Sequence, residues 1–181
     1  MRFRATDVIG AVVIEPERHE DERGFFARTW DSGEFVAQGL EGRLAQCSIS
    51  FNRVRGTLRG LHYQAAPNEE AKLVRCTAGG IFDVCVDLRP ASKTFLRWMG
   101  VDLTADNRLA LYVPKGCAHG FLTREDDTEV AYQISEFYAP EAGRGVRWDD
   151  PTFGIEWPGD VLVLNDRDRS YPDFVPAGSR S

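Results

Sequence analysis

Histidine is scarce in this 181-residue sequence, which contains only His19, His62 and His119. Histidine is the one side chain whose ordinary titration lies near neutral pH, so an imidazole base must be one of these three. His62 and His119 lie in unusual sequence surroundings. These two are therefore the candidates for a base.

Cysteine pairs of the CxxC type are absent from the sequence, which removes the usual signature of a zinc site or a dithiol redox centre. The four cysteines are Cys47, Cys76, Cys85 and Cys117. Three of them lie in apolar or β-like surroundings, where cysteine usually acts as a small hydrophobic residue. We therefore expect free thiols, most of them in the core.

Long apolar runs and excess positive charge are also missing. No stretch approaches the roughly 20 apolar residues that span a bilayer, and residues 1–10 have no long apolar run behind their basic side chains. The formal net charge of −6 argues against nonspecific binding to nucleic acid, which depends on basic residues. We expect a cytoplasmic protein that binds neither membrane nor nucleic acid, although a single anionic ligand remains compatible with this charge.

Helix signals are few, whereas short strand patterns are frequent. Residues 31–35 favour a short helix over residues 34–38, with Gly39 as its end. Residues 73–88 contain two apolar runs split by Ala-Gly-Gly, which predicts a hairpin with a glycine turn. Further strands are expected in residues 95–103, 109–113 and 129–137.

Close spacing of short strands predicts a sandwich or barrel. The length and the 43% hydrophobic share suit one compact domain, residues 1–181. We expect its core over roughly residues 1–175 and a frayed C-terminal tail, because the last residues offer few anchors.

His62 is flanked by two arginines and two glycines in RGTLRGLHYQ, residues 55–64. Cations and an adaptable backbone beside a histidine are typical of a catalytic site that binds an anion. His119 follows a tight turn in VPKGCAHGF, residues 113–121. A hydrogen-bonded core histidine is the alternative for both, and the local sequence favours it for His119.

A barrel with interior histidines also raises the possibility of a metal site, since two histidines and a carboxylate suit iron or manganese. Position 64, two residues after His62 and on the same strand face, is Gln. The compact ligand pair is therefore missing, and we expect no metal.

Five further side chains suit an anionic substrate or a proton transfer. Lys72 begins an apolar strand and would stabilise an oxyanion if it faced a cavity, the alternative being a solvated edge lysine. Arg23 and Arg59 suit a pyrophosphate clamp, with ion pairing to nearby carboxylates as the alternative for Arg23. Tyr132, six residues before Tyr138, would share a sheet face with it if the strand continued, and either phenol would serve as a proton donor or as core packing.

Taken as an ordered set, these segments resemble the dTDP-4-dehydrorhamnose 3,5-epimerases. The matching segments are residues 21–26 (DERGFF), 56–64 (GTLRGLHYQ), 72–75 (KLVR), 82–89 (FDVCVDLR), 113–121 (VPKGCAHGF), 138–141 (YAPE) and 145–151 (GVRWDDP). The resemblance implies a mainly β, cupin-type jelly-roll barrel (a double-stranded β-helix) with a few short helices. It further implies a homodimer and an isomerase that needs no cofactor and no metal.

The resemblance also assigns roles. It implies epimerisation of a nucleotide-linked 4-keto-6-deoxyhexose at C3 and C5, in deoxysugar and polysaccharide synthesis. His62 would be the base, oriented by Asp168, while Lys72 would stabilise the enolate and Tyr132 would return a proton to the opposite face of the ring. The residues expected to bind substrate are Arg23, Arg28, Gln46, Ser48, Arg59, His119 and Tyr138.

Two positions depart from the pattern that we expect of the family. Arg28 stands where deoxythymidine-linked members are expected to carry Glu, and Ser48 where many carry Asn. If position 28 contacts the nucleotide, Arg28 replaces a hydrogen-bond acceptor with a cationic donor. The identity of the nucleotide base in the substrate is therefore left open. Also open are inversion of one carbon instead of two, a noncatalytic barrel that only binds a sugar nucleotide, and a metal-dependent barrel oxygenase or isomerase.

Overall fold

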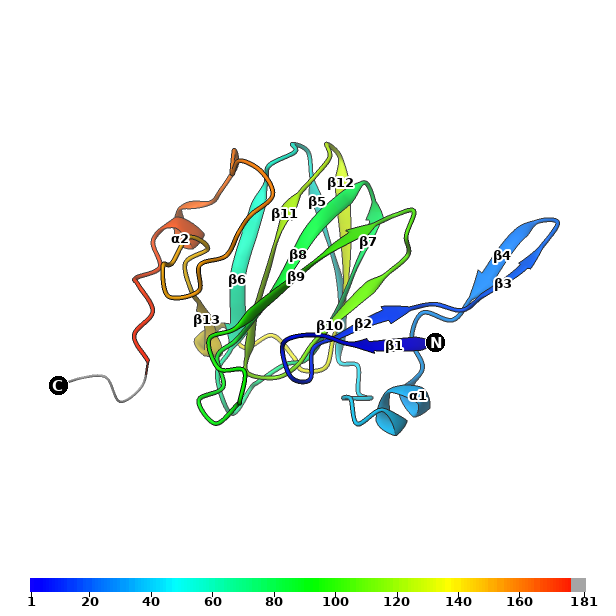
Figure 1. Ribbon diagram of the computed structural model, residues 1–181, viewed down its shortest axis with the longest axis horizontal. Coiled ribbons are helices and arrows are strands. Elements are labelled where there is room, and N and C mark those ends of the chain that lie inside the picture. Colours follow the sequence, from blue (N-terminus) through cyan, green and yellow to red (C-terminus); the bar gives the residue numbers. More distant parts are fainter. Residues whose placement is uncertain (177–181) are drawn as a thin grey trace.

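The structure is a computed structural model that describes residues 1–176, and its framework is two antiparallel sheets packed face to face (Figure 1). The six-stranded sheet has the order β1 (Arg2–Ala5), β2 (Val12–Glu15), β10 (Ala110–Val113), β7 (Lys72–Ala78), β12 (Thr128–Ile134) and β5 (Gln46–Asn52). The five-stranded sheet has the order β13 (Gly143–Gly145), β6 (Leu58–Gln64), β11 (Cys117–Thr123), β8 (Gly80–Asp87) and β9 (Trp98–Thr104). The predicted jelly-roll barrel of the cupin type is confirmed.

Helices are short, as predicted. They are α1 (Ser32–Ala37), α2 (Asp166–Arg169) and the 3₁₀ turn η1 (Pro140–Ala142). Asp31 caps α1 by accepting a hydrogen bond from the backbone N–H of Glu34 at 3.0 Å, and Gly39 follows the helix with a φ of +73°. No helix within the described part of the chain is both long and apolar enough to cross a membrane.

The predicted hairpin over residues 73–88 is wrong. Its two strands exist as β7 and β8, but β7 pairs with β10 and β12 whereas β8 pairs with β11 and β9. The glycine turn therefore carries the chain from one sheet to the other. It packs closely against β12, since a Cβ at Gly79 would lie 2.5 Å from Oγ1 of Thr128. Both runs are mainly apolar, so their pattern does not indicate which strand lies beside them.

The other predicted strands are found with shifted ends. The strand expected at residues 95–103 is β9, which begins only at Trp98 because Leu96 adopts a φ of +65° in the preceding turn. The strand expected at residues 129–137 is β12, which ends at Ile134. The predicted frayed tail falls almost wholly on residues 177–181, outside the described residues.

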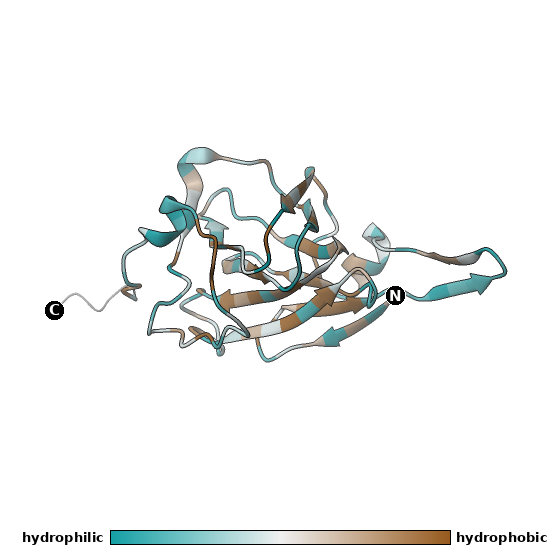
Figure 2. Cartoon of the chain, turned by 90° about the horizontal axis from the view of Figure 1, so that it is seen from above, coloured by the Kyte–Doolittle hydropathy of each residue, from teal (hydrophilic) through white to brown (hydrophobic). Residues whose placement is uncertain are grey.

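Three apolar clusters hold the barrel together. One lies between the sheets, and each of the other two covers the outer face of one sheet. Phe35 of α1 packs on the outside of the six-stranded sheet, and Phe153 and Trp157 of the C-terminal segment pack on the outside of the five-stranded sheet. Figure 2 shows the resulting hydrophobic strands of the barrel. The central strands β8 and β11 are apolar on both faces because both faces are covered.

The cysteines are free thiols, with Cys76, Cys85 and Cys117 buried and Cys47 exposed. Burial raises the pKa of the Cys76 thiol to about 11. The expectation of core thiols is confirmed, and a neutral buried thiol is chemically inert.

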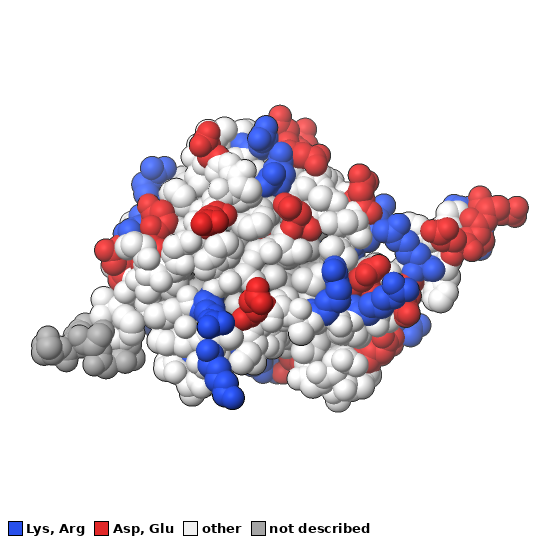
Figure 3. Space-filling model, in the orientation of Figure 1, with Lys and Arg blue, Asp and Glu red and all other residues white. Residues whose placement is uncertain are grey.

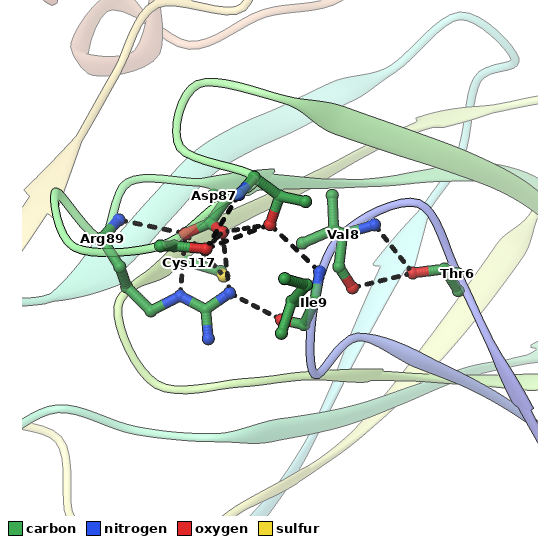
Figure 4. Close-up of polar contacts among 8 residues, drawn as sticks. Thr6, Val8, Ile9, Asp87, Arg89 and Cys117 are labelled. Carbon is green, nitrogen blue, oxygen red and sulfur yellow. Dashed lines mark hydrogen bonds and ion pairs between the residues drawn. The ribbon is translucent and has the colours of Figure 1, made fainter.

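A buried carboxylate ties the N-terminal turn to the end of β8 (Figure 4). Asp87 accepts hydrogen bonds from Nε and Nη2 of Arg89, both at 2.8 Å, and from the hydroxyls of Ser92 at 2.5 Å and Thr94 at 2.7 Å. Arg89 also donates to the carbonyl of Ile9 at 2.6 Å. Burial by itself opposes ionisation of Asp87, but these donors outweigh it and lower its pKa to about 2.

The hairpin of β3 (Arg18–Asp21) and β4 (Gly24–Ala27), called the arm below, projects away from the barrel (Figure 1). Acidic side chains gather at its tip (Figure 3), which carries Glu20, Asp21 and Glu22. The C-terminal segment with α2 lies on the opposite side of the barrel from the arm.

Candidate active site

A cavity of about 350 Å³ lies within the barrel, and most of the predicted site residues line it. The volume is within the usual range of small-molecule sites. The predicted residues that line it are Gln46, Ser48, Arg59, His62, Lys72, His119, Tyr132, Tyr138 and Asp168. The structure does not bring Arg23 or Arg28 to this cavity.

An irregularity in β6 aims two of these side chains into the cavity. His62 is the cross-strand partner of His119, whereas Arg59 is the partner of Phe121. Two residues of β6, Gly60 and Leu61, thus lie opposite the single residue Gly120 of β11. This two-against-one pairing is a β-bulge. Side chains three apart in a regular strand point to opposite faces, so the bulge is what gives Arg59 and His62 a common side.

His62 is held by a buried carboxylate from the far end of the chain. Its Nε2 lies 2.7 Å from Oδ1 of Asp168, whose side chain is 1% exposed against 37% for His62. The backbone N–H of Gly60 donates to the other oxygen of Asp168 at 3.1 Å. Burial opposes ionisation of Asp168, but His62, Gly60 and nearby Arg167 outweigh it and lower its pKa. The imidazole is thus fixed by an ionised carboxylate and presents its remaining edge to the cavity.

His119, beside His62 on β11, has its own carboxylate. Its Nε2 lies 2.7 Å from Oδ1 of Asp83, and both side chains are almost fully buried. Burial raises the pKa of Asp83, an effect that His119 and Lys72 oppose. Within residues 1–176, Oδ2 of Asp83 has no hydrogen-bond partner. His119 is therefore both a hydrogen-bonded interior histidine and a wall of the cavity.

Lys72 enters the cavity from the opposite sheet, at the start of β7. Its ammonium lies 2.9 Å from a carboxylate oxygen of Glu70 and donates to the carbonyl of His62 at 3.3 Å. The Lys72 and Glu70 side chains are 12% and 9% exposed. The solvated edge lysine that the sequence left open is thereby excluded, because two partners hold this cation at the cavity wall.

Tyr132, on β12 of the six-stranded sheet, places its phenol in the barrel interior. Its ring meets that of His119 edge-on, with 6.2 Å between centroids, and its hydroxyl lies 3.4 Å from Oγ of Ser50. Burial raises the pKa of Tyr132, so the phenol holds its proton.

Tyr138 reaches the cavity by a route that the sequence did not predict. Because β12 ends at Ile134, the two tyrosines do not share a strand face, and Tyr138 belongs to the following loop. Its backbone N–H donates to Oε1 of Gln46 at 2.5 Å, and the residue is 63% exposed. Tyr138 therefore forms part of the cavity rim.

The two remaining predicted binding residues belong to the arm and its base. Arg23, at the arm tip, has an 85% exposed side chain that pairs with Asp21 at 2.5 Å. Arg28 pairs with Asp31 at 3.0 Å and borders a separate hollow with Glu34. Neither position is reached by the cavity of its own chain.

Several cavity residues escaped the sequence-based prediction: Ser50, Tyr63, Gln64, Glu70, Arg144 and Arg167. Asp83 was missed too, although a carboxylate inside the apolar run of β8 was a usable signal. In residues 1–176, no group of three His, Cys, Asp or Glu side chains is placed to hold a metal ion.

Two histidines of one sheet, each paired with a carboxylate, face a lysine and a phenol of the other sheet across the cavity, an arrangement that suits an enzyme of the jelly-roll class that transfers protons. The chain belongs to the dTDP-4-dehydrorhamnose 3,5-epimerase family, whose model matches residues 5–175. A dTDP-4-dehydrorhamnose 3,5-epimerase of Methanothermobacter thermautotrophicus is 46% identical over 173 residues, covering 94% of this chain and 92% of that protein.

Solved structures agree with this assignment. A dTDP-4-dehydrorhamnose 3,5-epimerase of Bacillus anthracis with bound TDP and PPi superposes with a TM-score of 0.91 at 38% identity, covering 96% of this chain and 99% of that one. A 3′-monoepimerase of Streptomyces bikiniensis in complex with dTDP-quinovose gives a TM-score of 0.86 at 36% identity, covering 94% and 86%. Enzymes named for two carbons and for one thus share this fold.

Proposed function

We propose that this protein epimerises a nucleotide-linked 4-keto-6-deoxyhexose at C3 and C5 by removing and returning protons through an enolate. One observation carries the proposal: His62 and Tyr132 reach the same cavity from opposite sheets of the barrel. Inversion needs a base on one face of a sugar ring and an acid on the other. Two groups on facing walls suit that requirement.

In this proposal, His62 removes the proton from a carbon beside the C4 ketone. Asp168 holds the imidazole at 2.7 Å and stabilises the imidazolium that forms. The Lys72 ammonium stabilises the enolate oxygen, and the two contacts that fix it reduce reorganisation during the reaction. The Tyr132 phenol then protonates the carbon from the opposite face. No redox cofactor takes part in this sequence of steps.

The proposed binding residues extend from the cavity to its rim. Arg59 is oriented by hydrogen bonds from its Nε to Oδ1 of Asn52 at 2.7 Å and from its Nη2 to the carbonyl of Phe51 at 3.5 Å, and its guanidinium suits a pyrophosphate oxygen. Gln46 and Ser48 border the cavity on β5, and Tyr138 offers an exposed ring at the mouth. We assign the sugar to the cavity, with His119 against it, and the nucleotide to the rim.

The arm supports a further part of the proposal, a homodimer with shared sites. Its Phe26 is 69% exposed, and Arg23 lies beyond reach of its own cavity. A projecting hairpin with an exposed aromatic ring suits contact with a second copy of the chain. In such a dimer, Arg23 and Arg28 bind the substrate of the partner subunit.

The proposal is tested by incubating the protein in D₂O with 4-keto-6-deoxyhexoses carried on thymidine, cytidine and guanosine diphosphates. NMR follows deuterium at C3 and C5. We expect exchange at both carbons, and the carrier preference reports on Arg28 and Ser48. Exchange at one carbon alone would identify a monofunctional epimerase. Tight binding without exchange would identify a noncatalytic sugar-nucleotide barrel and overturn the proposal.

A metal-dependent barrel is tested separately by elemental analysis and chelation. We expect activity to survive chelation, because no three His, Cys, Asp or Glu side chains among residues 1–176 are placed to hold a metal ion. Stoichiometric iron or manganese, with activity lost on chelation, would contradict this. We further propose that the chain works as one domain in the cytoplasm, which cell fractionation would check. We also propose that it serves dTDP-rhamnose synthesis for cell-surface polysaccharide, which a gene deletion would check.

A further inference from the structure

The phenol of Tyr132 has a single hydrogen-bond partner within residues 1–176, the hydroxyl of Ser50 at 3.4 Å. Ser50 lies on β5, the edge strand of the six-stranded sheet, and its side chain also lines the cavity. The Ser50 hydroxyl thus contacts both the phenol and the space that substrate and water enter. Nothing in the proposed epimerase chemistry has so far used this residue.

In the proposed mechanism, Tyr132 loses its proton each time it protonates a carbon of the substrate. When the Tyr132 O–H bond breaks to form a C–H bond, a phenolate is left in the barrel interior, where burial disfavours it. The proton removed from carbon is on His62, on the other sheet. Tyr132 must regain a proton before it can act again, and an enzyme that inverts two carbons needs it twice for each substrate molecule.

We propose that Ser50 is the proton relay that resets Tyr132, an inference that rests on the proposed epimerase function. Ser50 donates its hydroxyl proton to the phenolate, so the Ser50 O–H bond breaks and the Tyr132 O–H bond re-forms. Water in the cavity supplies the replacement proton to Ser50. The resulting hydroxide takes the proton from the His62 imidazolium, which restores the starting state of base, relay and acid.

Neighbouring groups are less suited to this role. Ser48 is the direct cross-strand partner of Tyr132, yet its hydroxyl makes no hydrogen bond to the phenol. His119 meets the Tyr132 ring edge-on, and its Nε2 is occupied by Asp83. Arg59 contributes charge instead, since its proximity opposes the rise in the pKa of Tyr132.

The experiment compares Ser50→Ala, Ser50→Thr and Ser48→Ala in D₂O, first with enzyme in excess over substrate and then with substrate in excess. In Ser50→Ala, we expect the first inversion within about threefold of wild type, while later inversions slow by about tenfold or more, the scale of one acid–base contribution. Product with one inverted centre should therefore accumulate. Ser50→Thr keeps a hydroxyl, so the later inversions should proceed at close to the wild-type rate. Ser48→Ala should raise KM but should not slow later inversions relative to the first.

The outcomes separate the relay from the epimerase proposal. Equal first and later rates in wild type and Ser50→Ala would overturn the relay while leaving the epimerase standing. Slowing of the first and later inversions to the same extent would also overturn it, because that result indicates a general loss of site structure. No exchange in wild type with any carrier would remove the epimerase proposal itself. Thermal melting of each variant checks that the barrel is folded.

Discussion

Arg59 and His62 face the same cavity although they are three positions apart in β6, because Gly60 and Leu61 together lie opposite Gly120 of β11. The bulge gives the candidate phosphate-binding residue and the candidate base a common side. It also turns the N–H of Gly60 toward Asp168. One backbone irregularity therefore positions both the candidate anion-binding residue and the His62–Asp168 pair.

We expect Gly60→Ala to disrupt both functions. Gly60 has a φ of +138°, and an added Cβ would lie 2.5 Å from Cα of Gly120. Unfolding in urea should show a loss of roughly 2–4 kcal/mol, combining backbone strain with a clash, together with loss of exchange activity. Gly24→Ala is the matched control for stability, because Gly24 has a φ of +124° with nothing within 4 Å of its Cβ position. Equal destabilisation of the two variants would mean that the close packing at Gly60 is unimportant.

Removal of the base should abolish proton exchange. His62→Ala is expected to lose exchange at both carbons, whereas Asp168→Asn should retain a trace, about 10²- to 10⁴-fold below wild type. In Asp168→Asn the buried amide can still contact His62 but cannot stabilise its imidazolium. Deuterium incorporation followed by NMR is the measurement. Exchange by His62→Ala at the wild-type rate would assign the base to another residue.

Tyr132→Phe should separate proton loss from inversion. His62, Lys72 and Asp168 remain, so the C–H bond still breaks, but the opposed acid is gone. We expect solvent exchange to persist while inverted product falls by about 10²-fold or more. The ratio of exchanged to inverted sugar measures this directly. A proportional fall in both would place Tyr132 in substrate binding instead of proton donation.

The shared-site dimer predicts complementation between inactive chains. His62→Ala and Arg23→Ala, refolded together, should regain about a quarter of wild-type activity at low substrate concentration, because half of randomly formed dimers carry one intact site. Lys72→Ala replaces Arg23→Ala in the control, since His62 and Lys72 line the same cavity of one chain. Recovery in the control, or none in the test mixture, would rule out exchange of the arms.

Asp87 predicts an acid-sensitive contribution to stability. Its folded-state pKa of about 2 lies below its unfolded value of about 3.9, so the stabilisation is complete above the unfolded pKa and is lost as pH falls toward 2. Its size is roughly 2–3 kcal/mol, because one pKa unit corresponds to about 1.4 kcal/mol. Asp87→Asn also leaves Arg89 without its charge partner and should cost about 3 kcal/mol at pH 7. Urea unfolding from pH 7 to 2.5 should show the gap between wild type and variant narrowing, and a constant gap would contradict the assignment.

Much of this arrangement follows from local sequence. Alternating and continuous apolar runs identified most strands, and the glycines around His62 indicated an adaptable backbone, which proved to be a bulge. The hairpin at residues 73–88 failed because a glycine turn between two apolar strands has the same sequence pattern whether the strands pair or change sheets. Only packing over the whole barrel distinguishes the two.

The features of the site that local sequence did not predict depend on partners that are distant in the sequence or point in an unpredicted direction. Asp83 is conspicuous as a carboxylate inside an apolar run, but its partner His119 is 36 residues away, and the Glu70–Lys72 pair depends on the direction of the Lys72 side chain. Arg23 and Arg28 were assigned to a site that their own chain does not bring to them. Pairings between distant elements of the chain are not encoded in local sequence patterns, so the His119–Asp83 and Lys72–Glu70 pairs emerge from the structure.

Asp168 is 106 residues beyond His62 and follows every strand of the barrel. During synthesis from the N-terminus, β6 and its histidine emerge long before the carboxylate that orients them. A chain that stops short of α2 contains all the strands and the imidazole but has no His62–Asp168 pair. On the proposed mechanism, full exchange activity would therefore require translation through residue 168, even though every strand of the barrel has been made before that point.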